Sequence, residues 1–197
     1  MCSWCAISGV LVDCSTAEED VQMKRTATGW FAYQGIALGI LLMLVSTASQ
    51  ARAAACAFIT LGAFALRRAT KFYTAVAASA AAGTLLSLAA GLPILAQGSA
   101  QIAYSIAALA LGLLTEGGLL LAVAAQRRAA GESTLITYVL LAARVAALVL
   151  QTAMSLTNFS DTVQSAGNTV QVLSLIGMIL VLFRTQREYI SAEGVSE

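Results

Sequence analysis

The sequence predicts an all-α protein, a polytopic membrane bundle of six transmembrane helices, and three observations support this. Of the 197 residues, 59% are hydrophobic and only 11% are charged, which lies outside the usual composition of soluble domains. The apolar residues fall into six runs, most of them near the ~20 residues that a helix needs to cross hydrocarbon. These runs do not alternate in polarity, as the shorter strands of a membrane barrel do.

The six predicted helices follow one another through short connections. Only the second and the sixth are marginal in length for a membrane span. Their residue ranges are 30–48, 49–66, 72–96, 102–125, 135–157 and 169–183. Basic connections divide them into three helical hairpins, 30–66, 72–125 and 135–184, and each hairpin is closed by a short turn on the other side.

Basic residues predict the orientation, because Lys and Arg near helix ends are retained on the cytoplasmic side. Nine of the eleven fall on one side of the bundle: Lys24, Arg25, Arg67, Arg68, Lys71, Arg127, Arg128, Arg184 and Arg187. The other side has only Arg52, beside Asp161, and Arg144 lies within the fifth helix. Both termini are therefore expected in the cytoplasm of a bacterium, with the bundle in its inner membrane.

This orientation divides the chain into a cytoplasmic N-terminal segment 1–27, a transmembrane domain 28–185 and a cytoplasmic tail 186–197. Met23 begins the stretch "MKRTATGWF" and offers a second start, so residues 1–22 are expected to be dispensable. A net charge of +1 gives no indication of nucleic-acid binding. Anionic lipid of the bilayer is a sufficient partner for the basic loops.

Small residues recur at every fourth position of two predicted helices. Helices in lipid associate by close packing, and small side chains let neighbouring backbones approach. The expected packing positions are Gly35, Gly39, Ser79, Gly83, Ser87, Gly91 and Gly117. A solute path along a groove of small residues is the alternative interpretation of the same pattern.

Two ionisable residues lie well inside the predicted hydrocarbon. An ionisable group at that depth has to be paired, hydrated or neutralised. Glu116 lies nine residues from the cytoplasmic end of the fourth helix, and Arg144 lies nine residues from that end of the fifth helix. At 1.5 Å per residue both are ~14 Å deep. We therefore predict a Glu116–Arg144 ion pair that faces the bundle interior, since a guanidinium can hold a carboxylate by two hydrogen bonds.

This pair has two interpretations. It is a brace that fixes how neighbouring helices align, since a buried pair contributes specificity more reliably than stability. Alternatively, it is a protonation switch or a polar element of a solute path. Thr115, Gln151 and Thr152 could add polar lining to such a path, or bond carbonyls of their own helices instead.

The N-terminus "MCSWC" places Cys2 and Cys5 in CxxC spacing. Two thiols at this spacing can bind a metal or form a disulfide reversibly. The chain has no His and no second CxxC motif, and the segment is expected in a reducing compartment. We therefore expect no metal site and name these two cysteines as its only candidates.

The residues that the chain lacks exclude several classes of membrane enzyme. Without His there is no axial haem ligand, no zinc-protease helix and no Ser/His catalytic pair. A glycine-rich phosphate loop is absent as well. We expect no catalytic residues and no cofactor, and hence no enzyme.

The central hairpin, "AAGTLLSLAAGLPILAQGSAQIAYSIAALALGLLTEGGLLLAVAAQRRAAGE", resembles the repeat of the HdeD family of short six-helix membrane proteins. The matching positions are Gly83, Ser87, Gly91, Gly117, Ala124 and Arg128. In the first hairpin, "GWFAYQGIALGILLML" and "LGAFAL" look like the corresponding parts. The resemblance implies a non-catalytic inner-membrane protein linked to acid resistance or another envelope stress response, with an uncharacterised mechanism.

Two rival functions suit the same residues. Three hairpins around a midplane charge pair also suit a small-solute or proton-linked ion transporter or channel. A continuous hydrated path to Glu116 would favour transport, whereas a dry, fully packed pair would favour a structural role. The third function is that of an accessory subunit, with a homo-oligomer or another membrane protein as the partner.

Overall fold

The computed structural model describes residues 6–7, 10–11, 14–45, 48–90, 92, 98–157 and 161–194. This part of the chain is almost entirely helical. The helices are α1 (Cys14–Val45), α2 (Ser49–Ala65), α3 (Lys71–Ala89), α4 (Gly98–Gly112), α5 (Gly118–Ala129), α6 (Leu135–Leu156) and α7 (Asp161–Gly194). A π-helical turn, η2 (Leu113–Gly117), joins α4 to α5 in one continuous rod. Two antiparallel two-residue strands, β1 (Ala6–Ile7) and β2 (Val10–Leu11), precede α1.

Within the described residues, four helical segments are long and apolar enough to cross a membrane. They are Lys71–Ala89, Gly98–Ala129, Leu135–Met154 and Thr162–Glu188, and the shorter segment Gly29–Val45 is also apolar. Large apolar side chains point outward along the bundle, among them Phe31, Leu85 and Leu180, each more than 60% exposed. An apolar surface of this kind suits lipid as the solvent. The fold is thus compatible with a multi-pass membrane protein.

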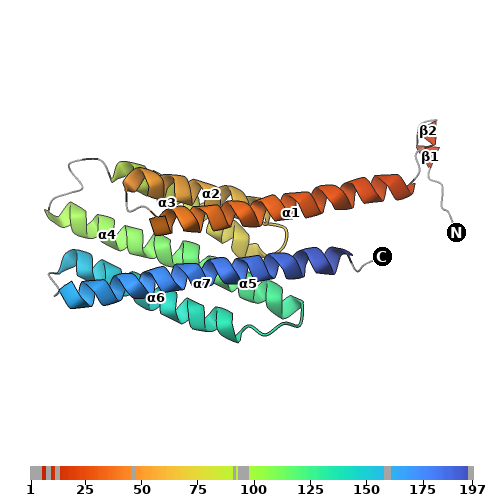
Figure 1. Ribbon diagram of the computed structural model, residues 1–197. Coiled ribbons are helices and arrows are strands. Elements are labelled where there is room, and N and C mark those ends of the chain that lie inside the picture. The colour runs from red at the N-terminus through yellow and green to blue at the C-terminus, as the bar shows by residue number, and fades with distance from the viewer. Residues whose placement is uncertain are drawn as a thin grey trace.

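The helices run alternately up and down the bundle (Figure 1). α1 begins and α7 ends at the same end, which is also where α2 leads into α3 and α5 into α6. We call this the termini end, and the opposite one the turn end. α2 packs against both α1 and α3, and α7 packs against both α6 and α1.

Helix boundaries differ from the hydropathy prediction at several ends. α1 starts at Cys14 rather than near Trp30, and α7 extends well beyond 169–183 on both sides. The extension of α1 and the C-terminal extension of α7 are rich in Glu, Gln, Lys and Arg, which are good helix formers but carry no membrane signal. α3 ends at Ala89 instead of reaching 96. Its sequence meets Pro93 four residues later, and proline disfavours helix in the residue before it.

Two glycines bring the backbones of α1 and α2 into contact. A Cβ atom added at Gly39 would lie 2.7 Å from the carbonyl oxygen of Ala55, and one at Gly62 would lie 2.5 Å from the carbonyl oxygen of Ala32. Any larger residue would force the two helices apart. Gly35 is less constrained, since its added Cβ would meet Phe58 at an ordinary 3.7 Å.

Candidate functional site

The site is centred on a buried ion pair between η2 and α6. The Arg144 side chain donates from Nε to Oε2 of Glu116, and the two residues are only 2% and 6% exposed. Arg144 also donates from Nη1 to the hydroxyl of Ser174 on α7, at 3.3 Å. The structure therefore brings together the two charges that the sequence analysis places at one depth, and ties α6 to both of its neighbours.

A second polar contact lies beside this pair. The Thr115 hydroxyl donates to Oγ of Ser79 at 3.0 Å, and the Ser79 hydroxyl donates to the carbonyl of Val76 at 3.1 Å. Thr115 and Glu116 both belong to η2, the π-helical turn. Such turns insert an extra residue into a helix and often mark functional sites. Here the turn directs consecutive polar side chains at different partners, Thr115 at α3 and Glu116 at α6.

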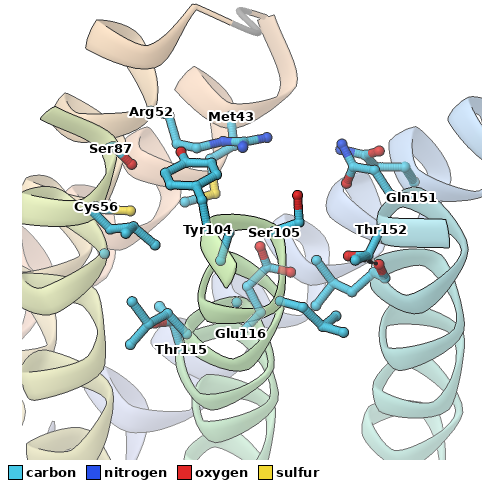
Figure 2. Close-up of a pocket in the computed structure, with 18 of the residues that line it drawn as sticks. Met43, Arg52, Cys56, Ser87, Tyr104, Ser105, Thr115, Glu116, Gln151 and Thr152 are labelled. Carbon is cyan, nitrogen blue, oxygen red and sulfur yellow. Dashed lines mark hydrogen bonds between the residues drawn. The ribbon is translucent and has the colours of Figure 1, made fainter. Parts of the chain in front are cut away.

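A cavity of about 240 Å³ adjoins the ion pair, and Glu116 and Arg144 both line it. It lies in the turn-end half of the bundle, because its lining includes Arg52 in the first turn of α2 and Ser87 near the end of α3. Figure 2 shows the carboxylate of Glu116 pointing into this space from below. The remaining lining residues are Met43, Cys56, Gly83, Leu86, Tyr104, Ser105, Ala108, Leu109, Leu111, Gly112, Thr115, Leu148, Gln151, Thr152 and Gln171.

One face of α4 and η2 forms the longest wall of the cavity. Its residues recur at helical spacing from Tyr104 to Glu116, a distance of ~18 Å along the axis at 1.5 Å per residue. On the opposite wall, Figure 2 shows Gln151 and Thr152 of α6. Leu148 and Arg144 of the same helix also line the cavity. The cavity thus extends from the turn end down to the charge pair.

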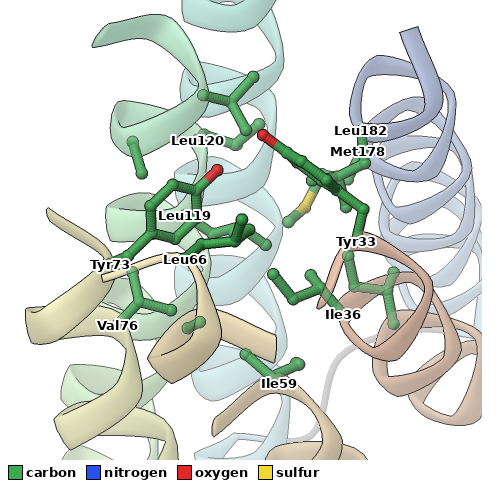
Figure 3. Close-up of a cluster of buried hydrophobic side chains, with 14 of the residues drawn as sticks. Tyr33, Ile36, Ile59, Leu66, Tyr73, Val76, Leu119, Leu120, Met178 and Leu182 are labelled. Carbon is green, nitrogen blue, oxygen red and sulfur yellow. The ribbon is translucent and has the colours of Figure 1, made fainter. Parts of the chain in front are cut away.

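The termini-end half is closely packed instead. Apolar side chains from α1, α2, α3, α5 and α7 fill it, among them Ile36, Val76, Leu119 and Leu182 (Figure 3). The hydroxyls of Tyr33 and Tyr73 both donate to Oε1 of Gln126, at 2.7 and 3.0 Å. This side chain of α5 therefore joins α1 and α3 across the core.

Ion pairs link neighbouring elements at the same end of the bundle. Arg127, only 5% exposed, contacts Glu132 at 3.4 Å and Glu188 at 3.5 Å. The exposed Arg184 contacts the same two carboxylates, at 3.9 and 3.1 Å. This network joins α5 to α7 and to the connection between α5 and α6.

Several buried polar atoms of this half lack a partner among the described residues. They are Oγ1 of Thr70, Nε2 of Gln126, Nε of Arg127, Oγ1 of Thr137 and Oε2 of Glu188. Each such atom carries a free-energy penalty unless water reaches it. The described part of the termini end is therefore closely packed, but not all of its buried polar atoms are hydrogen-bonded.

A comparison of the chain with known protein families, with characterised proteins and with solved structures found no match.

The small residues singled out in the sequence have different surroundings. Gly39 lies at the α1–α2 contact, and Gly117 faces Leu141 of α6. Gly83 and Ser87 line the cavity, so the small face of α3 leaves room there instead of only bringing helices together. Gly91 lies outside the described residues, as do Cys2 and Cys5. Within the described ranges, no three His, Cys, Asp or Glu side chains are grouped to hold a metal.

Thr115, Gln151 and Thr152 line the cavity, and Thr152 also donates to the carbonyl of Leu148 in its own helix. Sequence reasoning missed Tyr104 and Arg52 as lining residues. Tyr104 could not have been found from helical periodicity, because twelve residues at about 100° each leave it about 120° away from Glu116 in a regular helix. Arg52 could not have been found either, because the lateral position of α2 depends on tertiary packing.

Proposed function

We propose that the chain is a non-catalytic membrane protein that admits a small solute to the Glu116–Arg144 pair and passes it on when the termini end opens. In this proposal all six helical rods span the membrane as three hairpins, and both termini are cytoplasmic. The cavity then opens toward the opposite face. The observation that carries the proposal is the cavity itself, which reaches the buried ion pair from one end of the bundle.

The size and lining of the cavity favour solute binding over a purely structural brace. Protein interiors are packed with few voids larger than a water molecule. A volume of about 240 Å³ corresponds to about eight water molecules at about 30 Å³ each. Hydroxyl, amide and charged groups line it, so water or a polar solute can occupy it. A brace alone would be more stable without this space.

The form of the helices supports the same function. Transporters place their substrate sites near the midplane, at irregular stretches of helix. The π-helical turn supplies such a stretch at Glu116. The tight termini end favours a gated transporter over a permanently open pore, because Leu119 and Val76 are packed in the apolar core and do not line the cavity.

Substituted cysteines test the cavity. With the native cysteines replaced by Ser, Ser105→Cys places a thiol on the cavity wall, and Ala110→Cys places one on the exposed side of α4, where lipid should cover it. A membrane-impermeant, charged thiosulfonate reagent added to the non-cytoplasmic side of sealed vesicles should modify the first and spare the second.

Solute passage is measured on the same variants in proteoliposomes, from the swelling rate in small polar solutes. Before modification, vesicles with either variant should swell faster than protein-free vesicles. Treatment with the reagent should abolish this difference for Ser105→Cys and leave it unchanged for Ala110→Cys. If Ser105→Cys is unreactive from either side of the membrane, the cavity is not hydrated and the proposal is wrong.

A role in acid tolerance, as implied by the resemblance to the HdeD family, is a second candidate. The observation that favours it is the position of Glu116, the only acidic residue between Asp20 and Glu132, on a cavity that water can enter. Glu116 would then act as sensor or relay, with Arg144 as its partner. Acid-shock survival of cells that carry Glu116→Gln should fall at matched protein level, and unchanged survival would remove this candidate.

A further inference from the structure

We infer that the solute of this cavity is a small organic monocarboxylate whose carboxylate is held by Arg52, an inference that rests on the proposed function. Three charged side chains line the cavity, namely Arg52, Glu116 and Arg144. The last two neutralise each other in the ion pair. One positive charge, that of Arg52, is left for a ligand.

Arg52 is placed to be the first charge that a solute meets. It lies in the first turn of α2, and in Figure 2 it is at the upper end of the cavity with Tyr104, away from Glu116. None of the ion pairs among the described residues includes it. It is exposed, so its guanidinium keeps hydrating water until a solute replaces it.

The charges of the cavity select one negative charge. A guanidinium presents paired N–H donors that match the two oxygens of a carboxylate. A monoanion at Arg52 would bring the charge of the lined space to zero, and opposite charges attract strongly where water is scarce. A second negative group would leave the lined space with an uncompensated negative charge, since the Glu116–Arg144 pair is already neutral. Dianions are therefore disfavoured.

The walls define the rest of the solute. Leu86, Leu109 and Leu148 give apolar contact, while Ser105 and Gln151 offer hydrogen bonds. At the floor, Oε1 of Glu116 has no hydrogen-bond partner among the described residues, since its one bond uses Oε2. Because Arg52 and Glu116 lie at opposite ends of the cavity, a solute of a few carbon atoms could donate a hydroxyl to this oxygen only after it has left Arg52. The cavity volume limits the solute to a few carbon atoms, and a hydroxy-monocarboxylate such as lactate is a suitable probe.

The test compares three solutes in proteoliposomes of zwitterionic lipid at neutral pH: lactate, its uncharged amide lactamide, and the dianion succinate. Wild-type protein should pass lactate about tenfold faster than either of the others, the size of effect expected from one charge-assisted hydrogen-bonded contact. Arg52→Gln should bring lactate down to the rate of lactamide, and Arg52→Lys should restore part of the difference. Arg68→Gln is the matched control, because Arg68 is exposed at the termini end and does not line the cavity.

Each further outcome has a distinct meaning. Equal rates for lactate and lactamide, unchanged by Arg52→Gln, would overturn the inference and leave the proposed function standing. Arg52 would then serve an interfacial role such as contact with lipid phosphate. If none of the three solutes passes faster than in protein-free vesicles, the proposed function fails together with the inference.

Discussion

The two halves of the bundle bury polar groups in opposite ways. In the turn-end half, the ion pair and its neighbours adjoin a cavity, so water can supply the hydrogen bonds that protein does not. In the termini-end half, polar groups such as Arg127 lie among packed side chains, and among the described residues five buried polar atoms of this half lack a partner. The same composition thus gives a hollow half and a closed half. This asymmetry is what a protein that is open to one side of a membrane requires.

The largest expected effect is that of breaking the ion pair where the two halves meet. Arg144→Gln leaves Glu116 buried without its partner, which typically costs about 3–5 kcal/mol. Glu116→Gln should also destabilise, and the exchange of both residues, Glu116→Arg with Arg144→Glu, should recover much of the loss. Thermal unfolding in detergent measures all four proteins. A wild-type melting temperature for Glu116→Gln would show that the carboxylate does not stabilise the bundle.

One substitution made in each half tests the packing difference directly. Ala122→Leu adds three carbon atoms to a fully buried position of α5, and overpacking of this kind costs about 1–3 kcal/mol. Ala108→Leu adds the same atoms at the cavity wall, where there is room. It should leave the free energy of unfolding within about 0.5 kcal/mol of the wild type and slow solute passage. Equal destabilisation by both changes would mean that the cavity is filled in solution.

Amide side chains test the role of water. Gln126→Leu removes the acceptor that two tyrosine hydroxyls share, and should cost about 1–2 kcal/mol. Gln151→Leu on the cavity wall should cost less than this, because water replaces the lost amide. Chemical unfolding of both variants in the same detergent gives the difference, and a larger loss for Gln151→Leu would contradict the assignment of the two halves.

The smallest effect is expected at the rim of the closed half. Arg184 is 60% exposed in its side chain, and exposed ion pairs contribute at most about 1 kcal/mol. Arg184→Gln should lower stability slightly at low ionic strength and not measurably at high salt, because salt screens exposed charges. An effect that persists at high salt would show that Arg184 belongs to the closed core.

Hydropathy could predict the apolar helices, because a span in lipid must be apolar over its length. It could not predict that α1 begins at Cys14, since a helix that continues into water loses the apolar signal and keeps only propensity. Pro93 indicates a helix end in the sequence, but the apolar run continues past it, so hydropathy extended this helix to residue 96. Pro93 therefore indicated the end of α3 better than hydropathy did.

Depth along the helices was sufficient to place Glu116 and Arg144 together, because both positions can be counted from helix ends. Ser174 was not predictable as a partner of Arg144, since its approach depends on how α7 lies against α6. The cavity was not predictable either. A void results from the summed volumes of side chains on several helices, and no single helix shows it.

The π-helical turn has a geometric consequence for the rod from Gly98 to Ala129. One residue in an α-helix corresponds to a rotation of about 100°, so the extra residue of η2 shifts the phase of everything that follows it. Deletion of Leu114 would restore a regular helix. Either Glu116 would then turn away from Arg144, or Gln126 would turn away from the tyrosines. The π-helical turn therefore lets one helical rod direct Glu116 toward α6 in one half of the bundle and Gln126 toward α1 and α3 in the other.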